Sequence, residues 1–162
     1  MSLIVEREAG LDQLESASNL KGLFTMLKPS WPTLVNICIN YTFEDDEEMP
    51  HNVLAGLCHE LKKMAGQNVV EKITLKIWVP PDYHDFTGCN ELDDVLLGSP
   101  EGWPSLKEVS LSFGVLVEHD DTDNLVAFRK MPTMTKLVES ERVVFNLDID
   151  LCPIPVQLEL NY

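Results

Sequence analysis

Apolar and polar residues alternate in four stretches of the chain, and neighbouring stretches are 36 residues apart. Alternation of this kind is typical of β-strands that bury one face. The apolar positions are 37, 39 and 41, then 73, 75 and 77, then 109, 111 and 113, and finally 145, 147 and 149. Met1, Leu3 and Val5 also alternate, and a 36-residue step carries them onto 37, 39 and 41. A fixed period indicates an array of structural repeats.

The alternation predicts six strands, with helices between them. The strands are expected near residues 1–5, 33–43, 69–79, 105–117, 142–149 and 156–160, the last as a terminal cap. Apolar spacings of three and four predict helices over 11–27, 53–64, 92–96 and 125–138, the last interrupted at Pro132. The second helix is expected to end near Gly66 and the third at Gly98, whereas residues 82–90 are expected to form an irregular loop.

Strands that alternate with helices are expected to be parallel and joined by right-handed crossovers. Most even-numbered strand positions are polar, so one face of the sheet should contact water. A doubly wound sheet would cover both faces and would require continuous apolar runs. The pattern therefore favours an α/β fold, a right-handed solenoid of parallel strands alternating with helices at a 36-residue period, forming one domain over residues 1–162.

The apolar spacing resembles the Leu-x-x-Leu-x-Leu pattern of leucine-rich repeats. It occurs at positions 34, 37 and 39, at 70, 73 and 75, and at 106, 109 and 111. With Trp-Pro-Thr-Leu at 31–34 and Trp-Pro-Ser-Leu at 103–106, the array is most similar to divergent repeats that follow F-box domains in uncharacterised fungal proteins. No F-box is recognisable in this chain. The Asn or Cys that normally follows each repeat strand is replaced by Thr42, Trp78, Gly114 and Asp150.

The net charge bears on which partners the protein can bind, and the cysteines bear on its cellular compartment. The 27 acidic and 12 basic residues give a net charge of −15, which argues against nucleic acids and anionic membranes and favours a cationic protein surface or no electrostatic partner. The four cysteines are widely scattered, as in reduced cytoplasmic or nuclear proteins. Residues 1–10 do not resemble a secretory signal, and no apolar run reaches the roughly 18 residues of a membrane span.

The polar face of the sheet is the first candidate for binding. Residues one repeat apart should stack into columns, with 38, 74, 110 and 146 in one column and 40, 76, 112 and 148 in the next. Tryptophan is a frequent anchor of protein interfaces. The binding residues expected on the concave sheet face are Asn40, Tyr41, Lys76, Trp78, Ser112 and Asp148. The alternatives are a merely solvated face, or a Trp78 folded beneath Pro80 and Pro81.

A second candidate is the edge formed by the carboxyl ends of the strands, where residues 44–48, 82–85 and 118–123 are rich in acidic side chains. Solubility and protection of the sheet edge explain these charges better than a ligand does. Neither His84 with Cys89 nor Cys58 with His59 has the paired spacing of a zinc site, so no metal or cofactor is expected. Common catalytic motifs are also missing.

The leading hypothesis is therefore a non-enzymatic protein-interaction module that binds an unidentified protein on its concave sheet face. The alternatives are a small α/β enzyme with its site at the acidic edge, or an acidic inhibitor that occupies a basic surface of its target. Because terminal repeats expose apolar edges unless they are capped, we also expect partner strands or self-association through residues 1–5.

Overall fold

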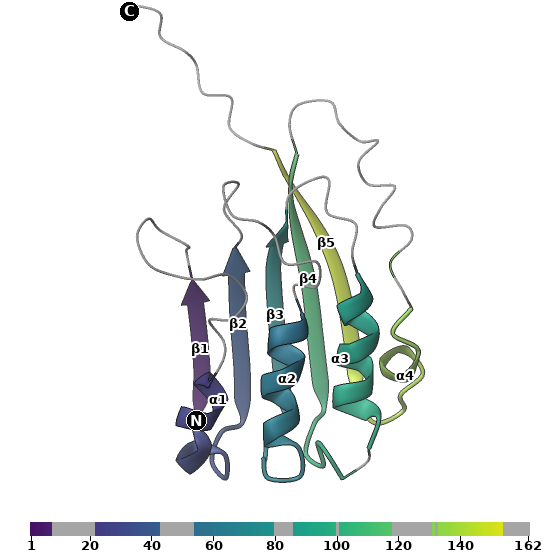
Figure 1. The fold of residues 1–162 in the computed structure, drawn as a ribbon. Helices are drawn as coiled ribbons and strands as arrows, with labels where there is room; N and C mark the ends of the chain where they lie inside the picture. The colour runs from purple at the N-terminus through teal and green to yellow at the C-terminus, as the bar shows by residue number, and fades with distance from the viewer. Residues whose placement is uncertain are drawn as a thin grey trace, which may run out of the picture.

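The sheet is parallel throughout, and its strands lie side by side in the order of the sequence. The computed structural model describes residues 1–7, 22–42, 54–79, 86–99, 101–117, 131 and 133–153. The order is β1-β2-β3-β4-β5 (Figure 1). The strands are β1 (Ser2–Arg7), β2 (Asn36–Thr42), β3 (Lys72–Val79), β4 (Glu108–Val117) and β5 (Val144–Pro153). An α/β fold with parallel strands alternating with helices is thereby confirmed.

The strand register follows the apolar period from β2 to β5 but not from β1 to β2. Ile37 pairs with Ile73, Ile73 with Val109, and Val109 with Phe145, so each step is 36 residues. Leu3, however, pairs with Ile37, a step of 34 residues, and the 36-residue register expected for the first strand is wrong. A shift of two residues returns every side chain to the same face of a strand, so the alternation could not reveal it.

Each inner strand begins three residues later than its apolar pattern suggested. Leu34, Val70 and Leu106 are buried but precede the strands. A repeated backbone geometry explains this: Glu71 O accepts hydrogen bonds from the N–H groups of Lys107 (2.8 Å) and Glu108 (3.1 Å). Val35 O accepts equivalent bonds one repeat earlier. At the other end of the sheet, β5 continues to Pro153, four residues beyond the expected end.

Within the described residues, the helices form a row along the sheet, since α1 contacts α2, α2 contacts α3, and α3 contacts α4 (Figure 1). Their bounds are α1 (Leu23–Met26), the 3-10 turn η2 (Lys28–Ser30), α2 (Ala55–Met64), α3 (Thr87–Leu97) and α4 (Thr135–Val138). The expected loop over 82–90 is wrong for residues 87–90, because α3 starts at Thr87 and buries Cys89 together with Leu92 and Leu96. The rest of the first and last predicted helices, and the predicted strand 156–160, lie largely or wholly outside the described residues.

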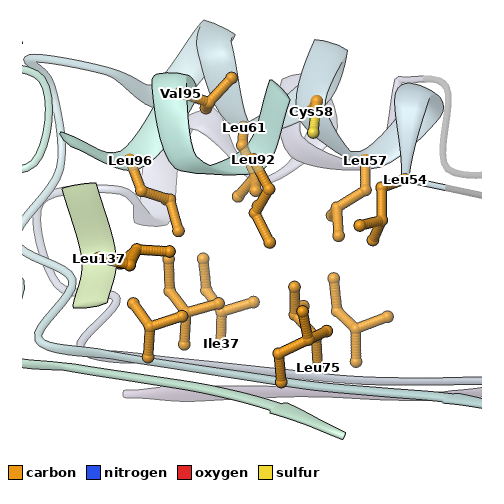
Figure 2. Packing of buried hydrophobic residues seen from close by; sticks show 14 of the residues in the cluster. Ile37, Leu54, Leu57, Cys58, Leu61, Leu75, Leu92, Val95, Leu96 and Leu137 are labelled. Carbon is orange, nitrogen blue, oxygen red and sulfur yellow. The ribbon is translucent and has the colours of Figure 1, made fainter. Parts of the chain in front are cut away.

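The hydrophobic core fills the space between this row of helices and one face of the sheet. Figure 2 shows Leu57, Leu61 and Leu92 pointing from the helices toward Ile37 and Leu75 on the strands. Burial of a leucine or isoleucine side chain of this kind contributes about 1.5–3 kcal/mol. The helix ends agree with the glycine positions, because α2 stops at Met64 and Gly66 follows with a φ of +73°.

Buried polar contacts fix the short elements to their neighbours. The indole N–H groups of Trp31 and Trp103 donate to the carbonyls of Phe24 (3.0 Å) and Val95 (3.1 Å), so both Trp-Pro segments are anchored to the helical residues before them. Asp93 of α3 accepts hydrogen bonds from the backbone N–H groups of Lys136 (3.0 Å) and Leu137 (2.8 Å). This buried carboxylate therefore satisfies two donors at the beginning of α4.

Candidate functional site

The face of the sheet opposite the core carries mostly small polar side chains, and we call it the open face. It is formed by the even-numbered strand residues, because alternate residues of a strand point to opposite sides. On the four strands β2 to β5 its described side chains are those of Asn36, Cys38, Asn40, Lys72, Thr74, Lys76, Trp78, Glu108, Ser110, Ser112, Gly114, Val144, Asn146, Asp148 and Asp150.

Both predicted columns of the open face are present. Cys38, Thr74, Ser110 and Asn146 are partners in register across the four strands. The next column consists of Asn40, Lys76, Ser112 and Asp148. The amide oxygen of Asn40 is buried and has no hydrogen-bond donor in the described part of the chain. Four of the six predicted binding residues thus lie in this second column.

Trp78 lies on the same face, one pleat further along β3, and its ring packs on the backbone of Gly114. A Cβ added to Gly114 would come within 2.3 Å of Cε3 of the Trp78 ring, so no larger residue fits there without movement. Trp78 is only half-buried, and it pairs with Gly114 in register. The alternative that Trp78 folds beneath Pro80 and Pro81 involves residues outside those that the structure describes.

Lys76 and Asp150 complete a cluster around this ring. Lys76 Nζ lies 4.7 Å from the Trp78 ring centroid, a distance typical of a cation–π contact. The same ammonium group lies 3.9 Å from Asp150 Oδ2 on β5, reaching across β4. We refer to Lys76, Trp78, Gly114 and Asp150 as the tryptophan cluster. It presents an aromatic surface with a cation and an anion beside it.

A second polar network lies nearer the amino ends of the strands. Lys72 Nζ is 2.7 Å from Glu108 Oε1, and the Ser110 hydroxyl lies 3.3 Å from the same carboxylate oxygen. The hydrogen bond from Lys72 lowers the pKa of Glu108. Asn146 Nδ2 donates to Ser110 Oγ (3.4 Å), which links β5 to the network. These side chains bond to one another within the sheet. This part of the open face therefore has fewer polar groups that could bind a partner.

Tyr41 does not lie on the open face, although it was predicted to bind there. It pairs with Ile77, is half-buried and packs against the core on the helix side of the sheet. The physical reason is the two-residue period of a strand, which places residue 41 with 37 and 39 and opposite to 40. Gly114 and Asp150 were missed, although one step of 36 residues from Trp78 leads to Gly114 and a second step leads to Asp150.

The predicted acidic edge lies outside the described residues, since 43–50, 80–85 and 118–130 are not among them. Cys58 of α2 and Cys89 of α3 are buried, and burial raises the pKa of each thiol to about 12. Such thiols are poor nucleophiles near neutral pH. His59 is exposed, as its helical position suggested.

Across the described ranges, no group of three or more His, Cys, Asp and Glu residues is placed to hold a metal ion. No helix in those ranges has the length and apolar character needed to cross a membrane. The chain matches no known family model, and no curated protein or solved structure is significantly similar to it. The geometry of the open face therefore carries the functional argument.

Proposed function

We propose that this protein is a non-catalytic protein-interaction module that binds a protein partner on the open face of its sheet. Its architecture would be a right-handed, leucine-rich-repeat-like solenoid with a 36-residue period and a concave open face. Repeat arrays of this type offer extended surfaces that suit protein recognition. Free, buried thiols at Cys58 and Cys89 are compatible with a reducing compartment, so we place the protein in the cytoplasm or nucleus.

The tryptophan cluster is the single observation that carries this proposal. Tryptophan is enriched among interface residues that contribute most of the binding energy. Here the ring is half-exposed and already held in place by Gly114 and Lys76, so little side-chain entropy would be lost on binding. Among the described residues no helix covers the surrounding polar open face, so this face is accessible to a partner.

Charge would set the preference for a partner. Asp148 and Asp150 are exposed near Trp78, and the whole chain carries a net charge of −15. A partner with a basic surface and one apolar recess would complement both the carboxylates and the ring. Of the residues predicted from the sequence, Asn40, Lys76, Trp78, Ser112 and Asp148 belong to this proposed surface, together with Asp150.

The test is an affinity capture from the native cell extract with wild type and a Trp78→Ala/Lys76→Glu variant. Loss of the indole anchor and reversal of a charge are expected to lower the affinity for a specific partner by at least about tenfold. The matched control is Met26→Ala/Lys62→Glu, which makes comparable changes at exposed positions on the helix side. A thermal melt of each variant checks that the fold is intact.

The outcomes separate the candidate functions. Selective loss of the partner in the open-face variant supports the proposal, whereas equal retention in both variants excludes the open face. Binding that weakens steeply as salt rises, with little effect of Trp78, would instead favour an acidic inhibitor of a basic protein. Turnover in a substrate screen by a chain that captures no partner would favour the enzyme alternative at the acidic edge.

A further inference from the structure

The outer edge of β5 is unpaired within the described part of the chain. β5 is the last strand of the sheet order and pairs with β4 through ten consecutive residue pairs, Glu108–Val144 to Val117–Pro153. Its other side has no strand partner among the described residues. An unpaired edge of this length presents a row of backbone donors and acceptors that a further strand can use.

The hydrogen-bonding pattern of β5 shows which residues direct their backbone N–H and C=O groups toward that edge. Val144 N–H donates to Lys107 O (2.8 Å), and the pairing with β4 then continues without interruption. Peptide groups of successive residues in a strand point to opposite sides. The even-numbered residues of β5 therefore bond to β4, whereas Phe145, Leu147, Ile149 and Leu151 direct their N–H and C=O groups outward.

The same odd-numbered residues carry an exposed apolar stripe on the helix side of the sheet. Leu147 is 43%, Ile149 37% and Leu151 41% exposed. Their partners on β4, which occupy the same columns, are at most 1% exposed: Leu111, Phe113 and Val115. In the described part of the chain, the short α4 covers little of β5, which agrees with the greater exposure of these three side chains (Figure 1).

The opposite side of β5 is acidic. Asp148 and Asp150 alternate with the apolar stripe and are both exposed. Asp150 lies 3.9 Å from Lys76, and no ion pair in the described ranges involves Asp148. The edge therefore combines outward backbone groups, an apolar stripe on one face and carboxylates on the other.

We propose that the outer edge of β5 accepts an extended segment of a partner protein whose apolar and basic side chains alternate. Added to the sheet as a further strand, such a segment would bond to the outward peptide groups of residues 145–151. Its apolar side chains would cover Leu147, Ile149 and Leu151, and its Lys or Arg side chains would lie beside Asp148 and Asp150. This edge shares Asp148 and Asp150 with the proposed open-face surface but does not include Trp78, so a Trp78→Ala variant distinguishes failure of one proposal from failure of the other.

A second copy of the chain complements this edge less well. Two β5 strands paired with each other would bring together the same side chains on the acidic face, namely Val144, Asn146, Asp148 and Asp150, none of which is cationic. Like charges placed opposite each other across a strand pair are destabilising. The net charge of −15 on each chain adds a further repulsion.

The first test uses labelled, end-capped peptides of about nine residues, with binding followed by fluorescence anisotropy at physiological salt. A peptide in which Val and Lys alternate is expected to bind. A peptide of the same composition with Val and Lys in separate blocks controls for net charge, and it is expected to bind at least about tenfold more weakly. Equal binding of the two peptides would overturn the proposal, since it would indicate only non-specific attraction.

Backbone methylation tests the strand geometry directly. In one peptide every Val is N-methylated, and in another every Lys, so each peptide loses the donors along one edge only. One of the two is expected to lose binding, and its identity reports whether the added strand is parallel or antiparallel to β5. Unchanged binding of both would exclude strand addition. Amide hydrogen exchange should slow at Leu147, Ile149 and Leu151 when the unmodified peptide binds, with much less change at Asn146 and Asp148.

Charge reversal on the protein provides the matched variants. The Asp148→Lys/Asp150→Lys variant is expected to bind the Val–Lys peptide about tenfold more weakly than wild type does. It should instead bind a peptide in which Val and Glu alternate. Glu101→Lys/Glu139→Lys makes the same change in net charge at exposed positions outside β5, and should leave the preference for Lys intact. Trp78→Ala should also leave peptide binding intact. A β5-paired dimer of the free chain in sedimentation would contradict the proposal in favour of self-association.

Discussion

β4 and β5 have similar apolar patterns, yet they experience different surroundings. Leu111 on β4 and Leu147 on β5 are the same residue type, one repeat apart and paired in register, but their exposed fractions are 1% and 43%. The difference comes from the neighbours that the structure describes: β4 lies between two strands under the row of helices, whereas β5 has one described strand neighbour and the four-residue α4. Apolar periodicity thus specifies the face of a residue without specifying what covers that face.

The largest expected effect is on stability when the two leucines are truncated in parallel. Leu111→Ala should lower the free energy of unfolding by about 3 kcal/mol, because it leaves a cavity in a closed core. Leu147→Ala should cost about 1 kcal/mol or less, since nearly half of the side chain already contacts water. Urea denaturation of both variants measures the difference. Equal losses would mean that something covers β5 in solution, and the contrast between the strands would disappear.

A second contrast concerns the column that contains Trp78, Gly114 and Asp150. Gly114→Ala should destabilise the protein by about 2 kcal/mol, because the new methyl group overlaps the Trp78 ring. Ser112→Ala, on the same face of β4, is the control and should change stability by less than about 0.5 kcal/mol. Adding Trp78→Ala to Gly114→Ala removes the clash, so the double variant should be more stable than the two single effects predict. Simple additivity would show that the ring does not rest on Gly114.

Much of this fold could be predicted from the apolar period, and the limits of that prediction have physical causes. The register of β2 to β5 and the two polar columns follow from the alternation, as does the split between Trp78 and the core residues. The first strand was misaligned because a two-residue shift preserves the faces. Tyr41 was assigned to the polar surface on its residue type alone, although its odd position in the strand already placed it with the core.

Buried carboxylates were the features that sequence patterns could not reveal. Glu60 and Asp93 lie on helices with many exposed charges, and nothing in their spacing separates them from solvated residues. Their roles depend on which element packs beside them: Asp93 binds the beginning of α4, and Glu60 interacts with Lys63 and with the backbone of Gly22 and Phe24. Contacts between elements of this kind emerge only once the helices are assembled.

The buried carboxyl group of Glu60 makes the stability of the fold depend on pH. Burial alone would raise the pKa of Glu60, but the hydrogen bonds from Lys63 and from the backbone of Gly22 and Phe24 outweigh it and lower the pKa. Because the folded-state pKa is below the unfolded value, the ionised carboxylate stabilises the fold above about pH 4.5. This stabilisation is lost as the pH falls through the folded-state pKa.

Glu60→Gln should therefore cost about 1 kcal/mol at pH 7, and the deficit relative to wild type should shrink below pH 4.5. Urea midpoints measured from pH 7 down to pH 3 test this expectation. Glu101→Gln, at an exposed position, should follow the wild-type curve throughout. A constant difference between Glu60→Gln and wild type over the whole range would show that ionisation of Glu60 does not contribute to stability.

The smallest expected effect compares an ion pair between inner strands with one that reaches the edge strand. Lys72 Nζ lies 2.7 Å from Glu108 Oε1 on the adjacent strand, whereas Lys76 Nζ lies 3.9 Å from Asp150 Oδ2 across β4. Double-mutant cycles with alanine should give a coupling of about 0.5 kcal/mol for the inner pair and less for the outer pair, since water screens all four groups. A stronger coupling at Lys76 and Asp150 would mean that this pair is fixed more firmly than its distance suggests. In that case Asp150 would be less available to a strand bound at β5, and Asp148 would carry most of the charge preference of that edge.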